Sequence, residues 1–175
     1  IGSSEVLSCD VVELPYEGGD ISMFVFLPKI RSKESFENII NKFSSSNVKT
    51  AIQSVQDKKV NLHFPMFNAT KRFDVTDIMK DMGLKDVFDS KLSDLTGFSK
   101  KWGMSVDTAV HKAFIQVDES GTEAAAASAF YSFRMMTYPA KVNVEINQPF
   151  VYMIYDKVTE VPIFIGTVMD PTLGA

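Results

Sequence analysis

Cysteine, histidine and surplus positive charge are scarce in this sequence, and each scarcity excludes a class of function. The single cysteine, Cys9, has no partner for an internal disulfide, and we expect a buried or half-buried structural thiol. Neither His63 nor His111 has a cysteine or a second histidine at ligand spacing, so we predict no metal site and no cofactor. A formal net charge of −4 leaves no basic surface for nucleic acid or for an anionic membrane.

Motifs of the common enzyme classes are missing as well. The sequence contains neither the G-x-S-x-G nucleophile motif nor the G-x-x-x-x-G-K phosphate-binding loop. Its carboxylates are scattered, with no apolar-flanked pair for acid–base catalysis. No apolar run approaches the length of a membrane-spanning helix. We therefore predict that the protein is not an enzyme and has no membrane partner.

Apolar residues, in contrast, are plentiful enough for a sizeable core. The chain has 175 residues, of which 45% are hydrophobic and 14 are phenylalanine, and this suits one domain or part of a larger one. It begins with Ile1 rather than methionine, which indicates a fragment or a processed start. No repeat, low-complexity tract or linker rich in Pro or Ser divides it, so we expect no internal domain boundary.

Hydrophobic patterning predicts a mixed α+β fold. Strands are expected at residues 6–14, 21–27, 60–64, 109–117, 141–146, 150–155 and 161–169. Gly18 and Gly19 indicate a hairpin turn between the first two strands. The last two strands are nearly all apolar, so we expect a terminal hairpin that is buried on both faces.

Two short helices are expected from apolar residues at helical spacing. The first covers residues 35–43, with Ser32 or Ser35 as its N-cap, and we expect residues 44–47 to end it. Residues 48–59 carry no clear pattern. The second helix covers residues 74–82, where Gly83 suits the C-terminal cap.

Residues 121–129 form the least ordinary stretch, because small side chains follow directly on an expected strand. An alanine run is the best helix former, so a short helix or an idle surface loop is one interpretation. The connection is, however, long for a compact domain, and long connections are often functional. Composition alone leaves both interpretations open.

Four stretches in order resemble the serpin family. Residues 11–23 are similar to the central hairpin of sheet B, and residues 108–113 to the start of strand five of sheet A. Residues 118–128 resemble the proximal hinge of an inhibitory reactive loop, and residues 144–154 resemble the C-terminal signature of the family. The resemblance covers essentially the whole chain as the C-terminal half of that fold. It implies an α+β fold with sheet B hairpins, two sheet A strands, few short helices and an exposed reactive-centre loop at about residues 119–141.

The resemblance implies suicide inhibition of a serine protease. The exposed loop is cleaved, the protease is held as an acyl-enzyme, and the N-terminal side of the loop enters sheet A as a new strand. Two alternatives stay open, a non-inhibitory carrier or chaperone of the same fold and an inhibitor of cysteine proteases. Residues 1–175 are expected to be a partial serpin domain without its N-terminal half, and a monomer that does not inhibit on its own.

The resemblance also assigns the hinge, whose residues are Glu119, Gly121, Thr122, Glu123, Ala124, Ala125, Ala126, Ala127 and Ser128. Alternation along a strand turns Thr122, Ala124, Ala126, Ser128, Phe130 and Ser132 inward on insertion. None of these inward residues is charged or proline, and either would stall insertion. This favours an inhibitory member of the family.

Counting from Thr122 as in inhibitory serpins puts the scissile bond between Met135 and Met136. Met135 suits the apolar primary pockets of chymotrypsin- and elastase-like enzymes. A loop one residue shorter puts the bond between Arg134 and Met135, and the target is then trypsin-like, because that pocket holds a carboxylate. Tyr138 is a more distant candidate.

Two further residues acquire a predicted role. For His111, which lies among apolar residues, a hydrogen-bonded structural role is favoured, and the resemblance implies the shutter region where sheet A parts. Asn68 begins an Asn-Ala-Thr sequon, a candidate glycosylation site in a secreted protein. The resemblance to the family and the sequon together lead us to expect secretion, with a cytoplasmic location as the alternative.

Overall fold

The computed structural model describes residues 1–100, 103–118 and 142–171. They fall into two compact units, one of residues 1–67 with 118–175 and one of residues 68–117. The mixed α+β class predicted from the sequence is confirmed. No helix of the described residues is long and apolar enough to cross a membrane.

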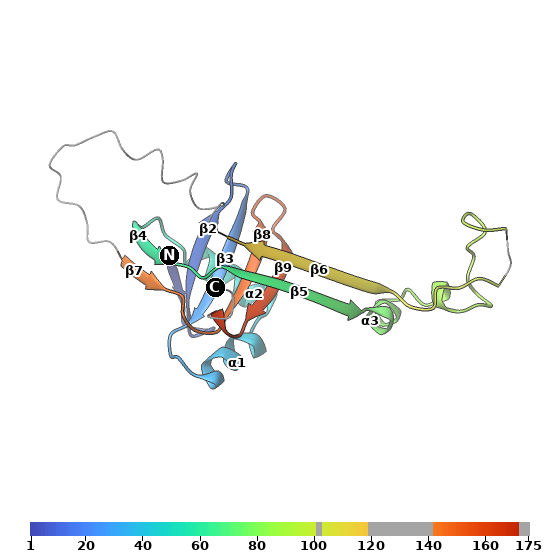
Figure 1. Ribbon diagram of the computed structural model, residues 1–175, viewed down its shortest axis with the longest axis horizontal. Coiled ribbons are helices and arrows are strands. Elements are labelled where there is room, and N and C mark those ends of the chain that lie inside the picture. Colours follow the sequence, from blue (N-terminus) through green and yellow to red (C-terminus); the bar gives the residue numbers. More distant parts are fainter. Residues whose placement is uncertain (101–102, 119–141, 172–175) are drawn as a thin grey trace. The chain divides into compact units, whose positions relative to one another are not determined.

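The first unit is built on a five-stranded antiparallel sheet (Figure 1). Its strands, in spatial order, are β1 (Gly2–Ser4), β2 (Cys9–Pro15), β3 (Ile21–Pro28), β8 (Phe150–Asp156) and β9 (Val161–Val168). The β2–β3 hairpin is confirmed, and Gly18 and Gly19 adopt positive φ angles of 88° and 79° in its turn. The β8–β9 hairpin is confirmed too, and β3 pairs with β8 to join the two hairpins.

The expectation that both strands of the terminal hairpin are buried is wrong for β9. Strand β8 lies in the middle of the sheet and is almost wholly buried, whereas the first five residues of β9 are exposed. β9 is the edge strand, and the helices pack on β1, β3 and β8 instead. An apolar strand therefore stays uncovered by the residues described here.

Two helices cover one face of this sheet. Helix α1 (Lys33–Asn41) begins at the predicted cap, where the Ser32 hydroxyl accepts a hydrogen bond from the Ser35 N–H at 3.1 Å. Helix α2 (Ser45–Gln53) was not predicted, and Ser44 caps its start rather than ending the helix before it. Apolar residues of both helices meet the sheet in one core, which includes Phe24, Phe26, Phe36, Ile39, Val48, Ala51, Val151 and Met153.

Cys9 belongs to this core, in agreement with the structural role expected from the sequence. Its side chain is fully buried in strand β2. Burial, reinforced by the charge of Asp10, raises the pKa of the thiol to about 12. Because the thiolate is the reactive form of cysteine, this side chain is chemically inert in the folded protein.

The other face of the sheet carries a cluster of aromatic rings formed by Phe64, Phe67, Phe150 and Tyr152. The rings of Phe67 and Tyr152 lie 5.3 Å apart, centroid to centroid. Phe150 is fully buried, and its ring centroid lies 5.9 Å from the centroids of both Phe64 and Phe67. Tyr152 in turn covers Gly166 of strand β9, its direct partner in the register.

Replacing Gly166 by alanine is expected to lower the free energy of unfolding by about 1–3 kcal/mol, the usual cost of overpacking. A Cβ atom there would overlap the ring of Tyr152, so the ring must shift from its place in the aromatic cluster. Urea denaturation measures the loss. Gly97→Ala is the matched control, because a Cβ at that position meets nothing within 4 Å. Equal effects of the two substitutions would contradict the packing argument.

Two smaller strand pairs lie outside the five-stranded sheet. Strand β4 (Val60–His63) runs parallel to β7 (Val142–Glu145). Strand β5 (Phe67–Asp74) pairs with β6 (Val110–Val117), and their arrows point in opposite directions in Figure 1. Strands β4, β6 and β7 fall where the sequence predicts them. Strand β5 was not predicted, because its polar side chains show no alternation that marks a buried face.

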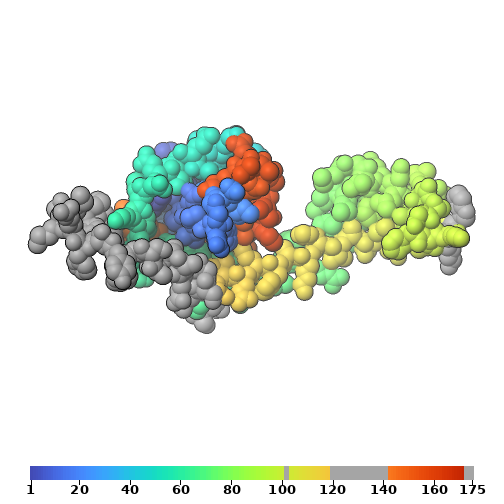
Figure 2. Space-filling view, turned by 90° about the horizontal axis from the view of Figure 1, so that it is seen from above, coloured from blue at the N-terminus to red at the C-terminus, as the bar shows by residue number. Residues whose placement is uncertain are grey.

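In the second unit, one helix and one 3₁₀ turn belong to the segment of sequence that connects β5 to β6. Helix α3 (Thr76–Asp81) lies within the predicted range, and Gly83 follows it with a positive φ of 102°. A 3₁₀ turn, η1 (Asp86–Phe88), occupies part of the expected loop. The segment between β5 and β6, green to yellow-green in Figure 2, gathers at one end of the strand pair.

Candidate functional site

The predicted reactive residues lie outside the described residues, but the strands on both sides of them are described. The hinge residues Glu119, Gly121, Thr122, Glu123, Ala124, Ala125, Ala126, Ala127 and Ser128 and the bond residues Arg134, Met135 and Met136 all belong to the range 119–141. Strand β6 ends just before this range, and strand β7 begins just after it. We call β6 the proximal base and residues 142–148 the distal base.

The proximal base is a strand with one face more buried than the other. Ala113, Ile115 and Val117 are half-buried, whereas the residues between them are exposed. The strand is held at its start, where the Ala109 N–H donates to Oγ1 of the buried Thr76 at 2.9 Å. Phe114 is exposed, so apolar surface remains on the outer face of β6.

His111 lies in β6 with an exposed side chain. Its predicted shutter role stays a prediction. Asn68 lies near the start of β5, where its side chain is exposed. In the described ranges no group of three or more His, Cys, Asp or Glu residues is placed to bind a metal ion.

The distal base is tied down by a parallel ladder. Val60 pairs with Val142 and His63 with Glu145 in the β4–β7 register. The Val142 N–H donates to the Lys59 carbonyl at 3.2 Å, and the Ile146 N–H donates to the His63 carbonyl at 3.0 Å. Side chains add to the ladder, since the Asn61 amide donates to Oδ1 of Asn143 at 3.2 Å.

Beyond β7 the chain is fastened to the turn that follows β3. The guanidinium of Arg31 donates from Nη2 to the Asn147 carbonyl at 2.8 Å. The Gln148 amide donates from Nε2 to the Pro28 carbonyl at 2.7 Å, so the two segments exchange two hydrogen bonds. Val144 and Ile146 are buried, which adds apolar contacts to this attachment.

Sequence reasoning missed Arg31, Asn61 and Gln148 as members of the site. Gln148 lies inside the C-terminal signature stretch, so its position carried a signal. Arg31 carried none, because it is 116 residues from Asn147 along the chain and sits in a polar turn. Only the folded structure brings these two residues together.

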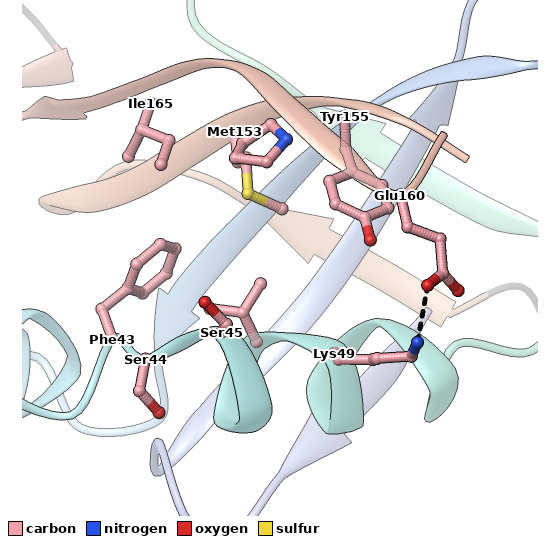
Figure 3. A pocket seen from close by; sticks show the side chains of 10 residues that line it. Phe43, Ser44, Ser45, Lys49, Met153, Tyr155, Glu160 and Ile165 are labelled. Atoms are coloured by element: carbon pink, nitrogen blue, oxygen red, sulfur yellow. Dashed lines mark hydrogen bonds and ion pairs between the residues drawn. The ribbon is translucent and has the colours of Figure 1, made fainter. Parts of the chain in front are cut away.

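A small cavity of about 210 Å³ lies elsewhere in the first unit, between helix α2 and strands β8 and β9 (Figure 3). Its apolar wall is made of Phe43, Val48, Met153, Tyr155, Pro162 and Ile165, and its polar rim of Ser44, Ser45, Lys49 and Glu160. At one end Lys49 donates to Glu160 at 2.7 Å. This hydrogen bond and the charge of Glu160 raise the pKa of Lys49, and both side chains of this ion pair stay about half exposed at the rim.

The fold and the site define a mixed α+β protein in which a long connection joins a strand of one small sheet to a strand of another. The chain belongs to the serpin family: it matches the family model described as "Serpin (serine protease inhibitor)" over residues 1–171. The predicted resemblance is thereby confirmed. Serpins are in general protease inhibitors and not enzymes.

Individual relatives agree with the family assignment. The chain is 36% identical to Serpin B12 of Mus musculus, with 98% of this chain and 41% of the relative covered. It is 31% identical to Serpin B3 of Homo sapiens, with 97% of this chain and 43% of the relative covered. A solved structure of a tumour-suppressing serpin matches with a TM-score of 0.71 and 26% identity, covering 97% of this chain and 44% of that one. The chain thus spans about two-fifths of the length of the relatives it matches.

Proposed function

We propose that this chain carries the reactive loop of an inhibitor of serine endopeptidases, and that it supplies the C-terminal part of one serpin domain. In this proposal a protease cleaves the loop, and the segment from Thr122 onward enters the sheet beside strand β6. The observation that carries the proposal is the alternation of half-buried and exposed residues along β6, which can be compared with the inward and outward residues of the hinge. With residues 118–121 as the turn, the inward hinge residues pair with the half-buried side of β6, and Glu123 pairs with its exposed side.

The register follows from the length of the turn. With residues 118–121 as the turn, Thr122 pairs with Val117, and each later residue pairs with the preceding residue of β6. Directly opposite residues of antiparallel strands share a face. Ala124 then lies beside Ile115 and Ala126 beside Ala113, both on the half-buried side. A register shifted by one residue would turn Glu123 to that side, which burial of a charge disfavours.

Insertion of such a strand into the sheet releases enough free energy to keep the protease trapped. All eight residues of β6 find a partner in residues 122–129. Each ladder hydrogen bond contributes about 1 kcal/mol net. Counting apolar burial as well, insertion of the strand stabilises the product by on the order of 10 kcal/mol. Alanine and serine side chains on the inward face limit steric resistance while the sheet opens.

We propose Met135 as the residue that fills the primary pocket of the protease, which makes chymotrypsin- or elastase-like enzymes the targets. Cleavage before Met135, with Arg134 in the pocket, is the alternative and points to trypsin-like enzymes. A cysteine protease trapped by the same loop is a further alternative that a panel of proteases separates. Secretion, glycosylation at Asn68, a shutter role for His111 and a monomeric state belong to the same proposal.

The test is an SDS gel of the full-length inhibitor after incubation with chymotrypsin, elastase or trypsin. We expect a covalent complex of higher mass that resists SDS, accompanied by release of a C-terminal peptide. Cleavage of the loop by every protease without a stable complex would overturn the inhibitory function and leave a non-inhibitory serpin.

One observation favours a carrier as the second candidate function. The cavity under helix α2 combines an apolar wall with a polar rim, which is the chemistry of a site for a small amphipathic ligand (Figure 3). Its 210 Å³ is below the range of about 300–1,000 Å³ that is typical of ligand sites. The inhibitor is therefore preferred. Fluorescence titration with anilinonaphthalene sulfonate, repeated on Val48→Trp to fill the cavity, tests the carrier.

A further inference from the structure

The two bases of the loop differ in how they are held. The distal base is joined to β4 by main-chain hydrogen bonds, and by side chains to the last residue of β3 and to the turn after it. Within the described residues, three side chains from outside β7 make or complete this attachment: Arg31, Asn61 and Gln148. We call these three residues the distal clamp.

Arg31 and Gln148 work as a reciprocal pair. Arg31 reaches from the turn after β3 to the Asn147 carbonyl, and Gln148 reaches back to the Pro28 carbonyl. Both bonds are shorter than 2.9 Å, and a charged donor makes a stronger hydrogen bond than a neutral one. Two bonds between the same two segments fix their orientation as well as their separation. The main-chain ladder holds residues 142–146, and these two bonds hold the residues that follow them.

The proposed scissile bond lies only a few residues from this attachment along the chain. Met136 precedes Val142 by six residues, and an extended chain spans at most about 3.5 Å per residue. The bond therefore lies within about 21 Å of a fixed point, and one residue further if Arg134 fills the pocket. A shift of the distal base moves the point from which the connection to the bond starts, and small misplacements of a reacting group cost large factors in rate.

Cleavage divides the loop into a proximal and a distal part. Before cleavage the distal base helps to set where the bond stands, whereas after cleavage the inserting strand is no longer joined to it. We propose that Arg31, Asn61 and Gln148 are positioning residues that act on formation of the acyl-enzyme and have no part in insertion. This inference rests on the proposed inhibitory function and adds to it the residues that present the bond.

The experiment measures two quantities for the full-length inhibitor with the protease that forms the complex. One is the second-order rate constant of complex formation, and the other is the number of inhibitor molecules consumed per protease trapped. For Arg31→Ala we expect the rate constant to fall roughly tenfold while the number consumed stays unchanged. Gln148→Ala and Asn61→Ala should show smaller effects of the same kind. Arg31→Lys should restore part of the rate, since it keeps a charged donor.

Lys42→Ala is the matched control, because it removes an exposed positive charge from the same unit and leaves the clamp intact. Rates are expressed per active inhibitor, so that a loss of folded protein does not count. If Arg31→Ala fails to fold, the milder Asn61→Ala and Gln148→Ala carry the test. Unchanged rate constants in these variants, or more inhibitor consumed at an unchanged rate, would overturn the clamp. A wild-type protein that forms no complex would overturn the proposed function instead.

Discussion

Replacing Ala126 by aspartate is expected to convert the inhibitor into a substrate. In the proposed register Ala126 is an inward residue of the hinge, so its side chain would enter the sheet beside Ala113 of β6 when the loop inserts. An isolated carboxylate at such a place costs several kcal/mol, even after the protein relaxes around it. The cleaved loop is then released rather than inserted.

The size of the effect follows from competition between insertion and deacylation. A penalty of about 3 kcal/mol on the insertion barrier slows that step by roughly two orders of magnitude. The substitution does not change the rate of deacylation, so hydrolysis of the acyl-enzyme becomes faster than insertion of the loop. We expect the number of inhibitor molecules consumed per protease trapped to rise at least about tenfold, with the SDS-stable band lost.

The adjacent substitution Ala125→Asp is the matched control. It introduces the same charge one residue away, on the face that stays in water in the proposed register. Its stoichiometry should remain within about twofold of the wild-type value, since the sequence already carries a carboxylate at Glu123 on the same proposed face. Equal damage from the two variants would show that the inward and outward assignment of the hinge is mistaken.

Strand pairing and one helix cap could be predicted because their signals are local. The β2–β3 hairpin follows from two apolar runs around a pair of glycines, and Ser32 marks the start of α1. Helix α2 escaped prediction because serines, an asparagine and a threonine make up much of it, and these residues favour caps and turns. Tertiary packing of Val48 and Ala51 against the sheet stabilises it instead.

Burial was harder to predict than strand position. Strands β8 and β9 have similar apolar composition, yet one is central and the other lies at an edge. Sheet order depends on contacts between residues far apart in the sequence, which a hydrophobic pattern does not contain. The same limit applies to the distal clamp, because nothing near Arg31 in the sequence points to Asn147.

The hinge and the scissile bond were predicted in the opposite way, from resemblance and from side-chain size. The absence of charge and proline from the inward positions is a property of the sequence alone. The register of the bond depends on a count along the loop, and a difference of one residue changes the class of protease. Substitution at the bond therefore has the greatest power to change the target.

Replacing Met135 by arginine is expected to redirect the inhibitor from chymotrypsin to trypsin. If Met135 fills the primary pocket, the new guanidinium pairs with the carboxylate at the base of the trypsin pocket. A pocket built for a polar partner rejects an analogue that lacks it by about 10⁴-fold or more. The rate constant for trypsin should rise by at least about 10³-fold, and the one for chymotrypsin should fall correspondingly.

Arg134→Ala separates the two registers. With Met135 in the pocket, this substitution should change the rate constant for chymotrypsin by no more than about threefold, as expected of a neighbouring subsite. With Arg134 in the pocket, the wild-type protein inhibits trypsin and Arg134→Ala abolishes that inhibition. The mass of the released C-terminal peptide gives an independent answer: a peptide that starts at Met136 requires cleavage after Met135, and a start at Met135 requires cleavage after Arg134. Agreement between the kinetics and the mass would assign the target class from a single bond.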